Sequence, residues 1–187
     1  MTFPVMFDRT IKPYILILTI IFAAAFLAGT LVPAPVRNEA TKAFQFVVDN
    51  YRGLEGGKLF FAILLQNVTT SFLILFSGVL IGIVPIFSMG SNGFILGVMY
   101  RHAAEVSGYS KAALKMLPHG VFELPALLIA ASYGLWLGMT VVQRMRGKES
   151  TRLRFQIEHA FRRYFTIVFP LLIVAAAIET ALILWLQ

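Results

Sequence analysis

Long uncharged apolar runs constrain this chain more than any other feature. Nineteen consecutive residues, Tyr14 to Val32, carry no formal charge, and a longer uncharged run extends from Leu59 to Phe87. A bilayer crossing needs about 20 predominantly apolar residues. Hydrophobic residues make up 58% of the 187 residues and charged residues 13%, which leaves too little polar surface for a soluble domain. The sequence therefore predicts an all-α integral membrane protein.

Five spans are predicted within a single polytopic membrane domain, residues 1–187. Two further segments have apolar residues at helical spacing but are too polar to span, so they are predicted to lie along the membrane surface. The predicted spans are 14–32, 60–87, 92–104, 118–142 and 164–186, and the predicted interfacial helices are 38–52 and 149–162. The third span is short, and a re-entrant hairpin is the alternative for it.

Basic residues set the predicted orientation. Of the sixteen Lys and Arg residues, seven lie between Arg144 and Arg163, beside hydrophobic segments. This placement favours a cytoplasmic, anionic lipid surface as their partner over nucleic acid. Five crossings of the plasma membrane, with the N-terminus in the cytoplasm and the C-terminus outside, put nine Lys and Arg inside against seven outside. Four crossings give eleven against five, which charge counting slightly prefers. The residues expected to face lipid headgroups are Arg152, Arg154, Arg162 and Arg163.

Polar residues inside the apolar runs favour five crossings. Glu123 and Glu179 are costly in hydrocarbon unless they have a partner or a task. Five crossings bring both to the same side of the membrane, together with polar residues of the other segments. His119 lies four residues before Glu123, on the same helix face. The predicted intramembrane cluster is Asn67, Arg101, His119, Glu123 and Glu179.

This cluster is compatible with several roles. It can hold the bundle together through ion pairs. It can also relay protons or ions, because histidine titrates near neutral pH and desolvation raises the pKa of a glutamate toward that range. One histidine with one or two glutamates is a poor ligand set, so no metal site is predicted. The chain has no cysteine and no nucleotide-binding or hydrolase motif, so we assign no cofactor and no catalytic residue.

Glycines repeat at four-residue spacing on the apolar segments. In lipid, such pairs let helix backbones approach closely, and three pairs predict a tightly packed bundle or a dimer interface. The pairs are Gly78 and Gly82, Gly93 and Gly97, and Gly134 and Gly138. Asn92, Pro118 and Gly120 are predicted to lie in turns.

Together these residues resemble the stage II sporulation protein M (SpoIIM-like) integral membrane proteins. The resemblance covers about residues 60–187 and is most specific around His119. It is carried by Asn67, the three glycine pairs, Ser91-Asn92-Gly93, Pro118-His119-Gly120 with Glu123, and Ala175-Ala176-Ala177-Ile178-Glu179. The resemblance implies a bacterial or archaeal plasma-membrane protein that works in a complex, since the namesake acts in endospore engulfment with membrane-anchored partners. It supplies no reaction.

Three functional hypotheses follow. The leading one is a non-enzymatic scaffold or subunit of a membrane or envelope complex, with a second copy or other membrane proteins as partners. The alternative is a transporter or permease-like subunit that uses His119, Glu123 and Glu179 as a protonatable or ion-binding centre. The third is a metal-assisted intramembrane hydrolase at His119 and Glu123.

Overall fold

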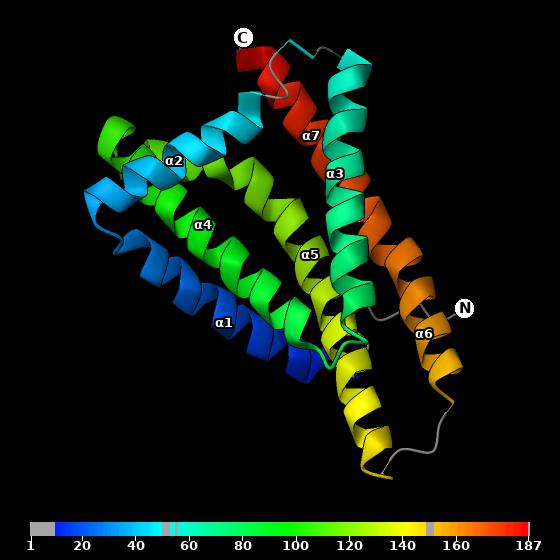
Figure 1. The fold of residues 1–187 in the computed structure, drawn as a ribbon. Coiled ribbons are helices and arrows are strands. Elements are labelled where there is room, and N and C mark those ends of the chain that lie inside the picture. Colours follow the sequence, from blue (N-terminus) through cyan, green and yellow to red (C-terminus); the bar gives the residue numbers. More distant parts are fainter. Residues whose placement is uncertain (1–9, 50–52, 55, 149–151, 187) are drawn as a thin grey trace.

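A bundle of long helices makes up the described part of the chain (Figure 1). A computed structural model describes residues 10–49, 53–54, 56–148 and 152–186, with the backbone alone described for residues 43–49, 115, 117–119 and 186. Its elements are α1 (Lys12–Thr30), α2 (Ala34–Asp49), α3 (Gly56–Ser77), α4 (Ile83–Ser107), α5 (Tyr109–Met145), α6 (Leu153–Arg163), the π-helical turn η1 (Tyr164–Val168) and α7 (Phe169–Leu186). Among the described residues, five helical stretches are long and apolar enough to cross a membrane, which confirms the prediction of an all-α membrane protein with about five spans.

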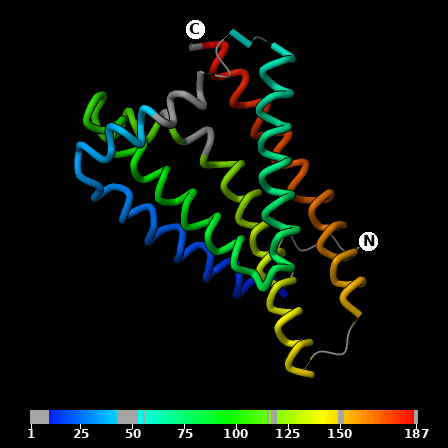
Figure 2. The backbone as a smooth tube through the Cα atoms, viewed as in Figure 1, coloured from blue at the N-terminus to red at the C-terminus, as the bar shows by residue number. Residues whose placement is uncertain are grey.

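Helix α5 is the centre of the bundle. It packs against each of the other spanning helices, and Figure 2 shows it passing between α4 and α7. In its spanning window 67% of the residues are buried, against 11–28% for the other four spans. Ala126, Ala130 and Ala131 are fully buried on α5, and their small side chains leave room for the neighbouring helices. The outer helices expose apolar side chains because their solvent is hydrocarbon.

The second and third predicted spans were wrongly divided. The run 60–87 is not one helix, because α3 ends at Ser77, the chain reverses through residues 78–82, and α4 begins at Ile83. Ile81 and Gly82 have φ values of 60° and 72°, a left-handed conformation that does not continue a right-handed helix. Helix α4 is therefore a full crossing of 25 residues, rather than the short span 92–104 or a re-entrant hairpin. No charged residue marks the reversal, so the apolar pattern conceals it.

Three residues predicted in turns lie inside helices instead. Asn92 is within α4, where its side-chain amide donates to the Ser88 carbonyl at 2.8 Å. Pro118 and Gly120 are within α5, which begins well before the predicted start at residue 118. Pro118 and Pro125 lack the amide that would bond to the carbonyl four residues earlier. Figure 1 shows that α5 changes direction along its length, as these missing bonds allow.

Both predicted interfacial segments are helical, but their bounds differ from the prediction. Helix α2 begins before the predicted 38–52, because Pro35 fits a first helical turn whose amides have no helical partner. Figure 1 shows α2 crossing one end of the bundle between α1 and α3. Helix α6 is not the separate helix that was predicted for 149–162. It continues through η1 into α7 as a rod of 33 residues, which is about 50 Å long at ~1.5 Å per residue.

Protein contacts hold α6 and η1 against the other helices. The His159 ring lies against the rings of Tyr133 and Trp136 on α5, with centroids 6.0 and 5.9 Å away. At the start of η1, the Tyr164 hydroxyl is 2.9 Å from the Ser71 hydroxyl on α3, and Tyr164 is fully buried. The apolar stripe of α6 is therefore partly covered by protein: Ala160 is fully buried, and Leu153, Ile157 and Phe161 are partly buried.

Two helix crossings bring backbones into direct contact at glycines. Where α1 crosses α4, a Cβ atom added to Gly29, Gly93 or Gly97 would approach the other helix's backbone to 3.0 Å or less. Where the end of α3 and the following turn meet α5, a Cβ atom on Gly78 or Gly138 would do the same. All six glycines of the predicted pairs lie at these two crossings: Gly78, Gly82, Gly93, Gly97, Gly134 and Gly138.

Replacing Gly97 with alanine is expected to force α1 and α4 apart. The new methyl group would overlap the Phe26 backbone, and such overpacking costs roughly 1–3 kcal/mol. Gly90→Ala on the same helix is the matched control, because its Cβ would meet only an Ile21 side-chain atom at 3.8 Å. Thermal unfolding in detergent should give a lower midpoint for Gly97→Ala alone. Equal midpoints for the two variants would contradict the backbone contact.

Candidate functional site

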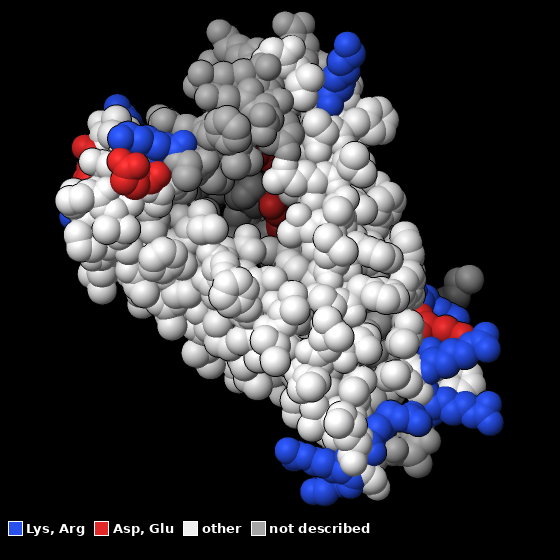
Figure 3. Space-filling model, in the orientation of Figure 1, with Lys and Arg blue, Asp and Glu red and all other residues white. Residues whose placement is uncertain are grey.

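Three polar residues lie on membrane helices that pack against one another. Asn67 is on α3, Glu123 on α5 and Glu179 on α7, and each is partly buried. The side-chain nitrogen of Asn67 is buried without a hydrogen-bond partner among the described residues. Figure 3 shows Asp or Glu atoms at the bottom of a hollow. The surrounding face is largely uncharged between the two charged ends of the bundle. The three helices thus pack against one another. Contact between the three side chains stays a prediction.

Glu123 also faces α1 and α4. It lines a small cavity together with Phe22 of α1 and with Asn92 and Leu96 of α4. Asn92 and Glu123 are the polar residues of this lining. Sequence reasoning assigned Asn92 to a turn and missed this position; the available signal was an amide side chain within an uncharged apolar stretch.

Arg101 belongs to a different group from the predicted intramembrane cluster. Its Nε donates to Glu105 Oε1 at 3.0 Å, and its Nη1 donates to the Tyr109 hydroxyl at 2.8 Å. These contacts lie where α4 passes into α5. The His119 side chain is outside the described residues, so its membership of the cluster stays a prediction. Within the described part of the chain, no group of three His, Cys, Asp or Glu residues is placed to hold a metal ion.

A buried arginine fixes α2 to the end of α4. Arg37 on α2 is 6% exposed and forms an ion pair with Glu105. Its Nη1 also donates to the Val32 carbonyl at 3.0 Å, in the connection that follows α1. Glu105 accepts hydrogen bonds from both Arg37 and Arg101. Because a buried charge is stable only when paired and hydrogen-bonded, this network holds α2 in one position.

A polar cleft lies beside this network, at the α2 end of the bundle. Its volume is about 530 Å³, and it is lined by Pro35, Asn38, Glu39, Thr41, Lys42 and His102. Glu39 and Lys42 are exposed and pair with each other at 2.9 Å. The cleft therefore offers charges of both signs. Sequence reasoning assigned no function to these residues.

The opposite end of the bundle is basic. Figure 3 shows Lys and Arg side chains gathered around the C-terminal end of α5 and around α6. Of the residues predicted to face lipid headgroups, Arg152, Arg154 and Arg162 are exposed and Arg163 is partly buried. Arg154 also pairs with Glu158 at 2.8 Å. The α6–α7 rod is longer than the hydrocarbon core of about 30 Å, so these charges have room to reach the membrane surface.

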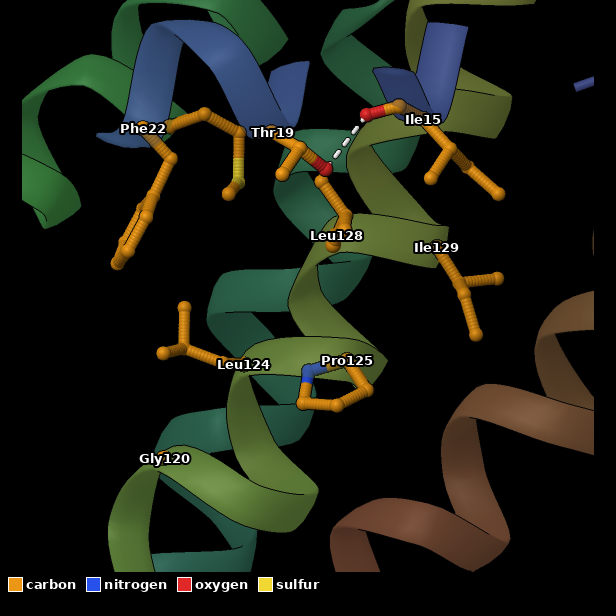
Figure 4. Close-up of a pocket in the computed structure, with 9 residues that line it drawn as sticks. Ile15, Thr19, Phe22, Gly120, Leu124, Pro125, Leu128 and Ile129 are labelled. Carbon is orange, nitrogen blue, oxygen red and sulfur yellow. Dashed lines mark hydrogen bonds between the residues drawn. The ribbon is translucent and has the colours of Figure 1, made fainter. Parts of the chain in front are cut away.

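An apolar cavity of about 370 Å³ lies between α1, α4 and α5 (Figure 4). It is lined by Ile15, Thr19, Phe22, Met89, Gly120, Leu124, Pro125, Leu128 and Ile129. In Figure 4 the Thr19 hydroxyl is bonded to the Ile15 carbonyl, at 2.7 Å, so the polar side chain of this wall is satisfied within its own helix. Thr19 and Pro125 are exposed. The cavity therefore opens at the membrane-facing surface, where it suits hydrocarbon rather than water.

Comparison with known proteins places these features in a family. The sequence matches stage II sporulation protein M over residues 15–182. The chain belongs to this family. The match extends beyond the resemblance seen from residue 60 onward, and it includes most of α1 and the Arg37 network of this SpoIIM-family protein.

Two proteins of Methanocaldococcus jannaschii are similar to this SpoIIM-family chain. The uncharacterized protein MJ0793 is 29% identical over 119 residues, which are 63% of this chain and 67% of that protein. The uncharacterized protein MJ0706 is 38% identical over 64 residues, which are 34% of this chain and 28% of that protein. No solved structure matches the chain.

Replacing Glu105 with glutamine is expected to loosen α2. The change leaves the buried Arg37 without its counter-charge, at a cost of roughly 1–3 kcal/mol. Hydrogen exchange of the amides in residues 36–42 should become faster. Glu39→Gln is the matched control, because it breaks only the exposed pair with Lys42, which is worth no more than about 0.5 kcal/mol. Unchanged exchange in Glu105→Gln would show that the ion pair does not hold α2.

Proposed function

We propose that this SpoIIM-family protein is a non-enzymatic scaffold or subunit of a plasma-membrane complex, and that the α2 end of its bundle binds a partner protein. The observation that carries this proposal is the Arg37–Glu105 ion pair. An amphipathic helix held by lipid alone needs no buried arginine. A surface that is already fixed loses little conformational freedom on binding, which favours affinity.

The chemistry of this end suits a polar protein surface. Asn38, Glu39 and Lys42 are exposed around the cleft, and Arg37 behind them is held in place by Glu105. Charges of both signs at an interface rim select the orientation and identity of a partner more than they add affinity. The expected partner therefore has a surface of mixed charge.

The proposed orientation puts the basic end in the cytoplasm and the α2 end outside. The described Lys and Arg residues at the basic end are Lys12, Arg144, Arg146, Lys148, Arg152, Arg154, Arg162 and Arg163. Excess Lys and Arg beside membrane spans favours the cytoplasmic side, where anionic lipids attract them. In this orientation the amino terminus is cytoplasmic, the carboxyl terminus is outside, and the α2 cleft faces the cell envelope.

Site-specific photo-crosslinking in cells tests the scaffold function. A photoreactive residue at the exposed position of Asn38 should form one dominant adduct with another protein. The yield of this adduct should fall several-fold when the photoreactive residue is combined with Glu105→Gln, because α2 is then no longer held by the ion pair. A photoreactive residue at Ile20, 59% exposed on the span α1, is the lipid-facing control. Absence of a protein adduct at position 38 at native expression would contradict the proposal. An adduct yield that Glu105→Gln leaves unchanged would also contradict it.

A second candidate function is a subunit that conducts protons or ions. The observation that favours it is the pair of carboxylates, Glu123 and Glu179, on membrane helices that pack together. Carboxylates within membrane spans commonly mark ion or proton pathways. Asn67 on α3, whose side-chain nitrogen is buried, adds a polar group of the kind that such pathways use.

Flux measurements test this second function. Purified protein in liposomes should show proton or cation flux, and Glu123→Gln should abolish it because the neutral amide cannot exchange a proton. Glu158→Gln, on the exposed surface of α6, is the control and should leave the flux unchanged. Equal flux in both variants would remove Glu123 from the pathway.

A further inference from the structure

The outer face of α3 carries polar side chains near the middle of a membrane span. Gln66, Thr69 and Thr70 are exposed on this helix, which is long and apolar enough to cross the bilayer. Gln66 is about 15 Å from the start of α3 at ~1.5 Å per residue. That distance is half of the hydrocarbon thickness of about 30 Å. These three residues therefore face lipid at a depth where water is scarce.

None of these three side chains forms a hydrogen bond to another described residue. Threonines on α1 behave differently, since Thr19 and Thr30 each donate to a carbonyl of their own helix at 2.7 Å. A threonine hydroxyl can always return to such a bond, but the longer glutamine amide has two donors and an acceptor to satisfy. Hydrocarbon supplies neither donors nor acceptors. Gln66 thus needs a polar partner from outside this chain.

Gln66 belongs to a seam with heptad spacing along α3. The seam residues follow one another at alternating intervals of four and three: Ala62, Gln66, Thr69, Leu73 and Phe76. This spacing lets one helix pack along another in a left-handed crossing. Leu73 and Phe76 are 60% and 49% exposed, and Figure 1 shows α3 at the front of the bundle with α7 behind it. Each seam residue is therefore at least partly exposed and within reach of a second helix, although the Phe76 ring also lies against Phe161 of α6.

We propose that two copies of this chain form a parallel homodimer through the α3 seam, with Gln66 of one copy hydrogen-bonded to Gln66 of its partner. A glutamine amide is self-complementary, because each copy donates to the other's oxygen across a two-fold axis. The two amides meet at one depth only when both copies insert in the same orientation, as copies of a membrane protein do. The short Ala62 and Thr69 side chains allow close approach on either side. This surface is separate from the α2 cleft.

Cysteine crosslinking locates the interface, since the chain contains no cysteine of its own. In native membranes under mild oxidation, Thr69→Cys should give a product of twice the monomer mass. Ile20→Cys, 59% exposed on α1, is the matched control and should stay monomeric. No product from Thr69→Cys, or equal yields from both positions, would overturn the proposed interface.

Energy transfer between labelled copies in liposomes measures the role of Gln66. Diluting the protein with lipid should dissociate the dimer, and Gln66→Leu should raise the dissociation constant by about ten-fold, because an interhelical hydrogen bond is lost. Thr19→Val, which removes a hydroxyl satisfied within its own helix, should leave it unchanged. Gln66→Leu places a more apolar residue in lipid, so an unchanged thermal midpoint verifies folding. Absence of energy transfer in the unmodified protein, or equal affinity in Gln66→Leu, would overturn the homodimer.

Discussion

Direct backbone contact at glycines is the constraint on which the arrangement of this bundle depends. Between helices in a bilayer there is no hydrophobic driving force, so close van der Waals contact must hold them together. At Gly93 and Gly97 the α4 backbone lies on that of α1, and at Gly78 the chain meets Gly134 of α5. The second crossing coincides with the reversal between α3 and α4. The turn that directs α4 back across the membrane is thereby held against the central helix.

The polar end of the molecule builds on these contacts. Because α1 and α4 are tightly paired, the connection after α1 carries the Val32 carbonyl to the same place as Glu105 at the end of α4. Arg37 bonds to both groups. The position of α2 thus depends on the α1–α4 crossing. The proposed partner-binding surface therefore also depends on the glycine contacts at that crossing.

Different kinds of signal explain what the sequence could and could not predict. Uncharged length identifies membrane helices, and four-residue glycine spacing points to helix crossings, because both are local patterns. The reversal at residues 78–82 escaped because an apolar turn buried in protein needs no charge. Arg37 and Glu105 are 68 positions apart, and no local pattern pairs them. The packing of α6 against the bundle depends on ring contacts between His159 and α5, which its amphipathic stripe does not specify.

The same contrast between local patterns and contacts of distant residues applies to the candidate site. The sequence identified Glu123 and Glu179 by their cost in hydrocarbon, but it placed Arg101 beside them, whereas Arg101 binds Glu105 and Tyr109. No role was assigned to Gln66 from the sequence, because its significance depends on which side of α3 is buried. The apolar cavity beside α1 also has a mechanical consequence. The tightly joined α1–α4 pair adjoins an open apolar space there, so α1 is held mainly by α4 and has less contact with α5.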